Sequence, residues 1–235
     1  MDPLAEVERV TGAFAAELDG ADPAAPLQAV RWTVQQVAAH LGAVHRWAAL
    51  NARTGHRNPR VNVPELDVTP AEWYAEARSE LLGTLHELDP DARCYTLSRT
   101  DKTVRFWHRR QLHESLIHLW DLRSRNPDAE PPGEVSEEVW IDTVDELFDV
   151  FLPRSSAADR LDLGGTLRIV ATGCGREWVF ARDWSPGEAR AATATVAASP
   201  ASLALFVWNR LDLDAVDTEG DPDVVARFRR AHIRP

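Results

Sequence analysis

Cysteine is scarce in this chain of 235 residues, which contains only Cys94 and Cys174. The two lie far apart in unlike contexts, so we expect neither a disulfide framework nor a cysteine-based zinc motif. Any thiol chemistry would then use a thiol from outside the chain. An excess of basic residues is also missing: the formal net charge of -11 argues against sequence-independent binding to nucleic acid, which depends on a basic surface.

Long apolar runs are absent as well. The hydrophobic stretches are far shorter than a bilayer crossing requires, so no transmembrane helix is expected. The first residues do not combine a basic start with an apolar stretch, as a secretory signal would, and we therefore expect the protein in the cytoplasm. With 44% hydrophobic and 27% charged residues, the composition is that of an ordinary globular protein of one large domain or two smaller ones.

Apolar residues recur at three- and four-residue spacing in four segments of the first half of the chain, which is the pattern of amphipathic helices. Asp2 and Pro3 form a start signal for the first segment, and the capping box from Thr69 to Glu72 opens the third. The expected helices span about residues 3–18, 33–54, 69–88 and 103–123. Four such helices predict a bundle.

Residues 124–133 are polar and contain three prolines and one glycine, which predicts a linker. A fifth helix at 136–152 follows, and the pattern then changes to the alternation typical of strands. The remaining expected elements are strands at 167–171, 177–180 and 192–197 and short helices at 200–209 and 222–231. The sequence therefore predicts an α+β protein with a helical bundle in residues 1–152 and a smaller α+β domain in residues 153–235.

Glu114 and His118 lie four residues apart in the fourth helix, so their side chains stack on one face. A carboxylate and an imidazole placed in this way form half of a divalent-metal site, and His40 of the second helix is available as a third ligand. Three protein ligands with open coordination positions are typical of a catalytic metal site. The alternative is a solvent-exposed Glu114–His118 pair and a core histidine at position 40.

The rotation per residue along a helix determines which neighbouring side chains lie on the same face as Glu114 and His118. Asp121 returns to within about 20° of Glu114 and can hydrogen-bond the far ring nitrogen of a ligand histidine. Arg110 extends the same face by one turn. His113 points about 100° away and is not expected to be a ligand. Because His113 and His118 are five residues apart, the zincin motif, which needs two histidines four residues apart, is excluded.

Four other histidines lie off these helix faces or in loops, and we expect their side chains at the surface. They are His45, His56, His86 and His108. Most of the nine tryptophans are expected to pack in the core or between domains.

Two segments together resemble the mycothiol-dependent maleylpyruvate isomerase family of the DinB-like superfamily. They are WTVQQVAAHLGAVHRW at residues 32–47 and the pattern R-R-x-x-H-E-x-x-x-H-x-x-D at residues 109–121. The resemblance covers nearly the whole chain, since residues 203–221 resemble the second domain of the family. It implies a DinB-like four-helix bundle that carries a metal site, followed by a domain similar to sterol-carrier folds.

The same resemblance implies that His40, Glu114 and His118 bind a divalent metal, with zinc the expected ion, and that mycothiol is the thiol cofactor. The implied reaction adds a thiolate to a conjugated cis-alkene, allows rotation about the resulting single bond, and eliminates the thiol. Arg110 and Arg210 are candidates for holding substrate carboxylates in a pocket between the domains, because guanidinium groups match carboxylates. Surface or structural ion pairs are the alternative role for both arginines.

Leu119 stands where members of the family often carry arginine, which leaves the substrate open. Two further functions therefore remain: a mycothiol S-transferase acting on an electrophilic toxin or biosynthetic intermediate, and a non-catalytic carrier of a small apolar ligand. The expected partners are a small-molecule substrate and a low-molecular-weight thiol, without nucleic acid or membrane, and the chain is expected as a monomer or homodimer. Its arginine-rich, alanine-rich composition, with Lys102 as the only lysine, agrees with the GC-rich genomes of actinobacteria, which make mycothiol.

Overall fold

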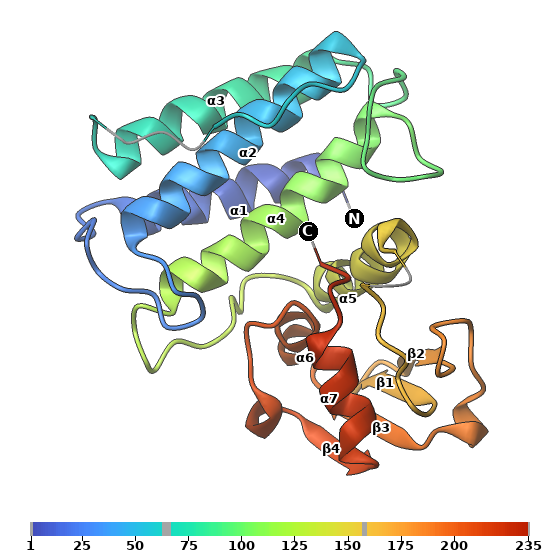
Figure 1. The fold of residues 1–235 in the computed structure, drawn as a ribbon. Coiled ribbons are helices and arrows are strands. Elements are labelled where there is room, and N and C mark those ends of the chain that lie inside the picture. Colours follow the sequence, from blue (N-terminus) through green and yellow to red (C-terminus); the bar gives the residue numbers. More distant parts are fainter. Residues whose placement is uncertain (1, 63–66, 157–158, 235) are drawn as a thin grey trace. The chain divides into compact units, whose positions relative to one another are not determined.

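The computed structural model describes residues 2–62, 67–156 and 159–234. The chain forms two compact units, Met1–Pro132 and Gly133–Pro235 (Figure 1). None of the helices in the described part of the chain combines the length and apolar character that a bilayer crossing requires.

The first unit is a bundle of four helices, which lie alongside one another in Figure 1. They are α1 (Pro3–Leu18), α2 (Val34–Thr54), α3 (Pro70–Glu87) and α4 (Val104–Arg123). Helix α1 packs against α3 and α4, and α2 packs against the same two helices. The expected four-helix bundle is thus confirmed.

The helix ends follow from local hydrogen bonding. The Asp2 side chain accepts from the backbone N–H of Leu4 and caps α1. Capping boxes begin α2 at Thr33 and α3 at Thr69, where each side chain satisfies backbone N–H groups that the first helical turn leaves without a partner. Helix α2 ends at Gly55, which has a φ of 76°, a conformation that costs glycine little because it has no Cβ.

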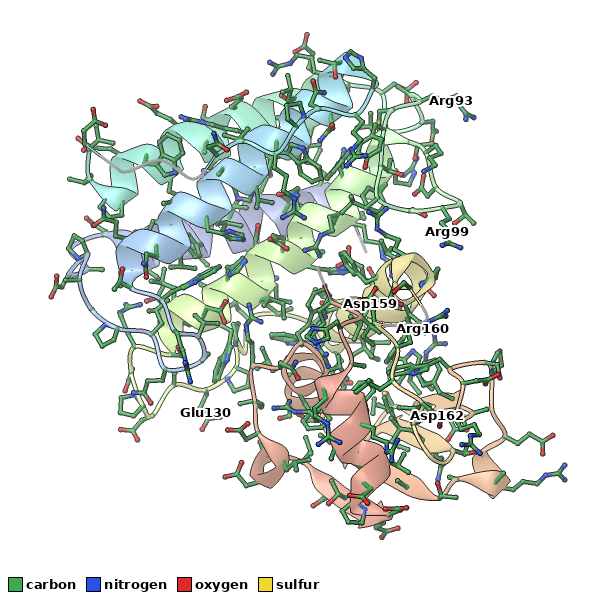
Figure 2. All side chains as sticks on the ribbon, in the orientation of Figure 1. Arg93, Arg99, Glu130, Asp159, Arg160 and Asp162 are labelled. Atoms are coloured by element: carbon green, nitrogen blue, oxygen red, sulfur yellow. The ribbon has the colours of Figure 1, made fainter. Side chains whose placement is uncertain are left out.

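The segment that joins α3 to α4 is held against the start of α4. The indole Nε1 of Trp107 donates to the backbone oxygen of Tyr95 at 2.9 Å. Arg93 and Arg99 of this segment are exposed and point away from the ribbon (Figure 2). The fixed segment defines where α4 begins, and α4 carries two of the three candidate metal ligands.

The second unit begins with helix α5 (Glu137–Glu146), which continues as a π-helical turn at Leu147–Phe151. Helix α5 packs against α6 (Pro200–Val207) of the same unit, and the Trp208 indole Nε1 donates to the Thr143 backbone oxygen at 3.0 Å. The structure therefore groups α5 with the sheet, whereas the sequence placed the boundary after residue 152. The two units divide earlier, between Pro132 and Gly133.

The second unit contains a four-stranded sheet with the order β2-β1-β3-β4. Its strands are β1 (Leu167–Ala171), β2 (Arg176–Phe180), β3 (Ala194–Ala198) and β4 (Asp217–Gly220). Strand β1 is antiparallel to β2 and parallel to β3, and β4 is antiparallel to β3. Helix α6 packs against β1 and β3, and α7 (Pro222–Arg230) packs against β3. The predicted α+β class is confirmed.

Strand β4 was not predicted from the sequence. All four of its residues are exposed, and they show no alternation of buried and exposed positions. The strand is held by its pairing with β3, in which Ala194 faces Gly220 and Val196 faces Thr218. An edge strand formed by backbone pairing alone leaves no hydrophobic pattern to read.

Gly220→Ala is expected to destabilise the second unit. Gly220 has a φ of 84°, and an added Cβ would lie 2.2 Å from the backbone oxygen of Thr193. The backbone conformation alone costs a residue other than glycine about 1–3 kcal/mol, and the clash with the backbone oxygen of Thr193 adds to this cost. Urea unfolding measures the loss. Gly83→Ala is the control, because a Cβ at this helical position meets nothing within 4 Å. Equal stability of Gly220→Ala and wild type would contradict the prediction.

Candidate metal centre

The structure brings together the three residues that the sequence singled out as metal ligands. His40 lies on α2, and Glu114 and His118 lie one turn apart on α4. Each of the three offers one ligand atom, and these atoms all lie within 4.8 Å of one another. Glu114 Oε1 is 3.6 Å from His40 Nε2 and 3.4 Å from His118 Nε2.

These distances fit a shared ion better than direct hydrogen bonds. Zinc lies about 2.1 Å from nitrogen or oxygen ligands, so two ligands at a tetrahedral angle are about 3.4 Å apart. A good N–H···O hydrogen bond would bring the two atoms to about 2.9 Å. Two imidazoles and one carboxylate also form a donor set that suits zinc and other divalent first-row metals. The three side chains therefore fit a divalent cation.

Arg110 orients the carboxylate of Glu114. Its guanidinium forms an ion pair with Glu114 Oε2, one helical turn away, while Oε1 is the oxygen that faces the two imidazoles. The Arg110 and Glu114 side chains are only 5% and 12% exposed. An ion pair with so little solvent contact holds its geometry more firmly than a surface pair. From the sequence, Arg110 is expected to hold a substrate carboxylate. In the structure its guanidinium pairs with the carboxylate of Glu114, a candidate metal ligand.

Asp121 holds the ring of His118. Its Oδ2 lies 2.8 Å from His118 Nδ1, and the carboxylate is fully buried. Because a carboxylate only accepts hydrogen bonds, Nδ1 of His118 is the donor in this contact, and Nε2 faces Glu114. This is the geometry expected of Asp121 from its position three residues after His118.

The indole of Trp32 lies against both imidazoles of the cluster. Its ring centroid is 4.9 Å from that of His40 and 5.8 Å from that of His118, and it stacks on His118 with an interplanar angle of 22°. From the sequence, Trp32 is not distinguished from the tryptophans expected in the core. The feature that could have identified Trp32 is its position in the sequence. It comes immediately before Thr33, the N-cap of the helix that carries His40.

Two of the four histidines expected at the surface are buried. His45 is fully buried and His108 is 4% exposed, whereas His56 and His86 are exposed as expected. Burial lowers the pKa of His45 to about 4, so this ring is neutral at physiological pH. His113 is buried on α4 and is not a member of the three-residue cluster, in agreement with its predicted direction.

Arg210 belongs to the second unit. Its guanidinium donates to the backbone oxygen of Trp208 at 3.0 Å. A role for Arg210 in holding a substrate stays a prediction.

Comparison with known families separates the chain into two parts. Residues 4–123 match the family model described as the mycothiol maleylpyruvate isomerase N-terminal domain. The chain belongs to this family. Residues 138–227 match the MDMPI C-terminal domain model, whose start within α5 agrees with the grouping of that helix in the second unit. The family expected from the sequence is confirmed.

Solved structures support the same fold. The crystal structure of a mycothiol-dependent maleylpyruvate isomerase is 13% identical, with a TM-score of 0.62, over 93% of this chain and 92% of that chain. A point mutant of a mycothiol-dependent maleylpyruvate isomerase is 15% identical, with a TM-score of 0.67 and the same coverage. At these identities the likeness concerns the fold. No protein with a curated function matches the chain in sequence.

Proposed function

We propose that this member of the mycothiol maleylpyruvate isomerase family is a metal- and mycothiol-dependent isomerase of a small unsaturated diacid. The observation that carries the proposal is the placement of Glu114 Oε1 at 3.6 Å and 3.4 Å from the Nε2 atoms of His40 and His118. Family membership and two structural neighbours whose names include mycothiol and maleylpyruvate isomerase support it.

The proposed reaction needs a thiolate, and a thiol from outside the chain is the best source. Cys94 is buried, and burial raises the pKa of its thiol, which disfavours the reactive thiolate. A divalent metal bound by the cluster would lower the pKa of a coordinated thiol and favour its thiolate near neutral pH. Isomerisation then requires addition of the thiolate to the cis-alkene, rotation about the resulting single bond, and elimination of the thiolate. The thiol is regenerated, and no group of the protein is consumed.

The protein's own residues hold this site in order. Arg110 keeps Oε2 of Glu114 occupied and leaves Oε1 for the cluster, and Asp121 keeps the His118 ring turned so that Nε2 faces the same point. The ion pair with Glu114 favours this orienting role of Arg110 over a role in binding substrate. Arg210 is the remaining candidate for a substrate carboxylate, because its guanidinium can donate two parallel hydrogen bonds.

The test is an isomerase assay on purified protein with maleylpyruvate, with and without mycothiol. We expect conversion that requires mycothiol, falls to the uncatalysed rate after treatment with a chelator, and returns when zinc is added. Formation of a stable thiol conjugate without isomerisation would favour the S-transferase. Failure of every thiol and electrophile, together with an apolar ligand extracted from the protein, would favour the carrier and contradict the proposal.

A further inference from the structure

A chain of buried polar groups crosses the core of the bundle close to the candidate metal centre. Gln111 lies on α4, one turn before Glu114, and His45 lies on α2, five residues after His40. The Oε1 atom of Gln111 is 2.7 Å from Nδ1 of His45, and both side chains are fully buried. This contact joins the two helices that supply the three candidate ligands.

The contact continues to the other two helices of the bundle. Nε2 of His45 is 3.2 Å from the hydroxyl of Tyr74 on α3, and the same hydroxyl is 3.4 Å from the backbone oxygen of Thr11 on α1. Tyr74 and Thr11 are also fully buried. The four helices are therefore connected through one set of polar groups that solvent does not reach.

The protonation state of His45 gives the hydrogen bond to Gln111 a fixed direction. Burial keeps the ring neutral, so it has one N–H, which Nδ1 donates to Gln111 Oε1. The Tyr74 hydroxyl has one hydrogen, which it donates either to the other ring nitrogen or to the Thr11 backbone oxygen. A hydrogen bond of 2.7 Å requires a defined distance and angle between its groups, whereas apolar side chains tolerate small sliding movements.

Packing alone does not explain these polar residues. Apolar side chains of similar volume would fill the same space without the cost of removing polar groups from water. The Gln111 amide nitrogen is buried and has no hydrogen-bond partner in the described part of the chain, which adds to that cost. A pair retained at a cost in stability points to a requirement for a defined arrangement of α2 and α4.

We propose that His45 and Gln111 are positioning residues of the metal centre. Their hydrogen bond sets the rotation and axial position of α2 relative to α4, and thereby brings His40 Nε2 to Glu114 and His118. Metal–ligand distances tolerate deviations of only about 0.2 Å, whereas a one-residue slip of a helix moves its side chains by about 1.5 Å. This inference rests on the proposed metal centre and assigns to it two residues that do not contact the ion.

The test is the double variant His45→Leu/Gln111→Met, which replaces both members of the pair with apolar side chains of similar size. Urea unfolding of the metal-free protein should show a midpoint equal to or above that of wild type, because no polar group of the pair is left buried without a partner. Zinc affinity, measured by competition with a chromophoric chelator, should fall about tenfold, as for outer partners of a metal site. The visible spectrum of the cobalt-substituted protein should change as well.

Two controls separate positioning from general stability. Asn51→Leu removes a fully buried polar side chain of α2 that bonds to Trp47 and Asn58, so it should lower stability and leave zinc affinity unchanged. Tyr74→Phe keeps the bond between α2 and α4 and should also retain zinc affinity. Gln111→Met alone provides the same affinity readout if the double variant does not fold.

The outcomes distinguish failure of the positioning role from failure of the metal centre itself. Wild-type zinc affinity in the double variant, or an equal loss of affinity in Asn51→Leu, would overturn the positioning role while leaving the metal centre in place. Absence of zinc binding by wild-type protein would overturn the metal centre and this inference with it.

Discussion

His118→Ala protein purified without added metal is expected to contain no zinc, and wild-type protein is expected to retain one ion per chain. The substitution leaves only His40 and Glu114, which lie on different helices, and catalytic zinc sites have three protein ligands. Loss of a residue that only supports a metal ligand lowers metal affinity by about 10- to 100-fold. We expect the loss of His118, which is itself a candidate ligand, to lower zinc affinity by more than this. Elemental analysis of the purified proteins measures the metal content.

The fold should survive this substitution, because alanine is the strongest helix former and α4 is held by its apolar contacts. Far-UV circular dichroism should therefore show nearly unchanged helical content. His56→Ala is the matched control: it removes an exposed histidine of the same unit and should leave one zinc per chain. Retention of one zinc by His118→Ala would remove this residue from the assigned site.

Arg110→Met is expected to make the stability of the bundle depend on metal. The substitution removes the partner of Glu114 Oε2 from a nearly buried ion pair. Breaking a buried pair by removing one partner costs about 3–5 kcal/mol, because the remaining charge has no compensation. A zinc ion bound at Oε1 supplies positive charge to the same carboxylate, so added zinc should recover most of the loss. Thermal unfolding with and without zinc measures both effects.

Arg105→Met is the control for this experiment. Arg105 is paired with Asp91 at 2.7 Å, but both side chains are more than half exposed, so its loss should change stability little with or without zinc. The role assigned to Arg110 would be wrong if its replacement caused the same loss of stability in metal-free and zinc-loaded protein.

The helices of the bundle and the candidate metal ligands could be predicted from the sequence. The capping residues Asp2, Thr33 and Thr69 lie where side chains satisfy the first N–H groups of a helix, and the spacing of Glu114 and His118 fixes their common face whatever the helix packs against. These features depend on local geometry, which the sequence specifies directly.

The buried state of His45 depends on packing that no single helix shows. His45 is about 140° around the helix from His40, outside the main apolar stripe. Because α2 packs against both α3 and α4, a wider arc of its surface is buried than one stripe predicts. The same reasoning explains the position of the domain boundary, since the apolar face of α5 does not specify which unit covers it.

Strand β4 combines full exposure with negative charge: Asp217 and Glu219 both lie on it, and Asp221 follows directly. The outer backbone groups of an edge strand are a template on which a strand of another molecule can form. When two copies approach through this edge, carboxylates of the same sign meet and repel. The acidic side chains therefore protect the sheet against growth into strand-linked aggregates, a safeguard that requires no additional element of structure.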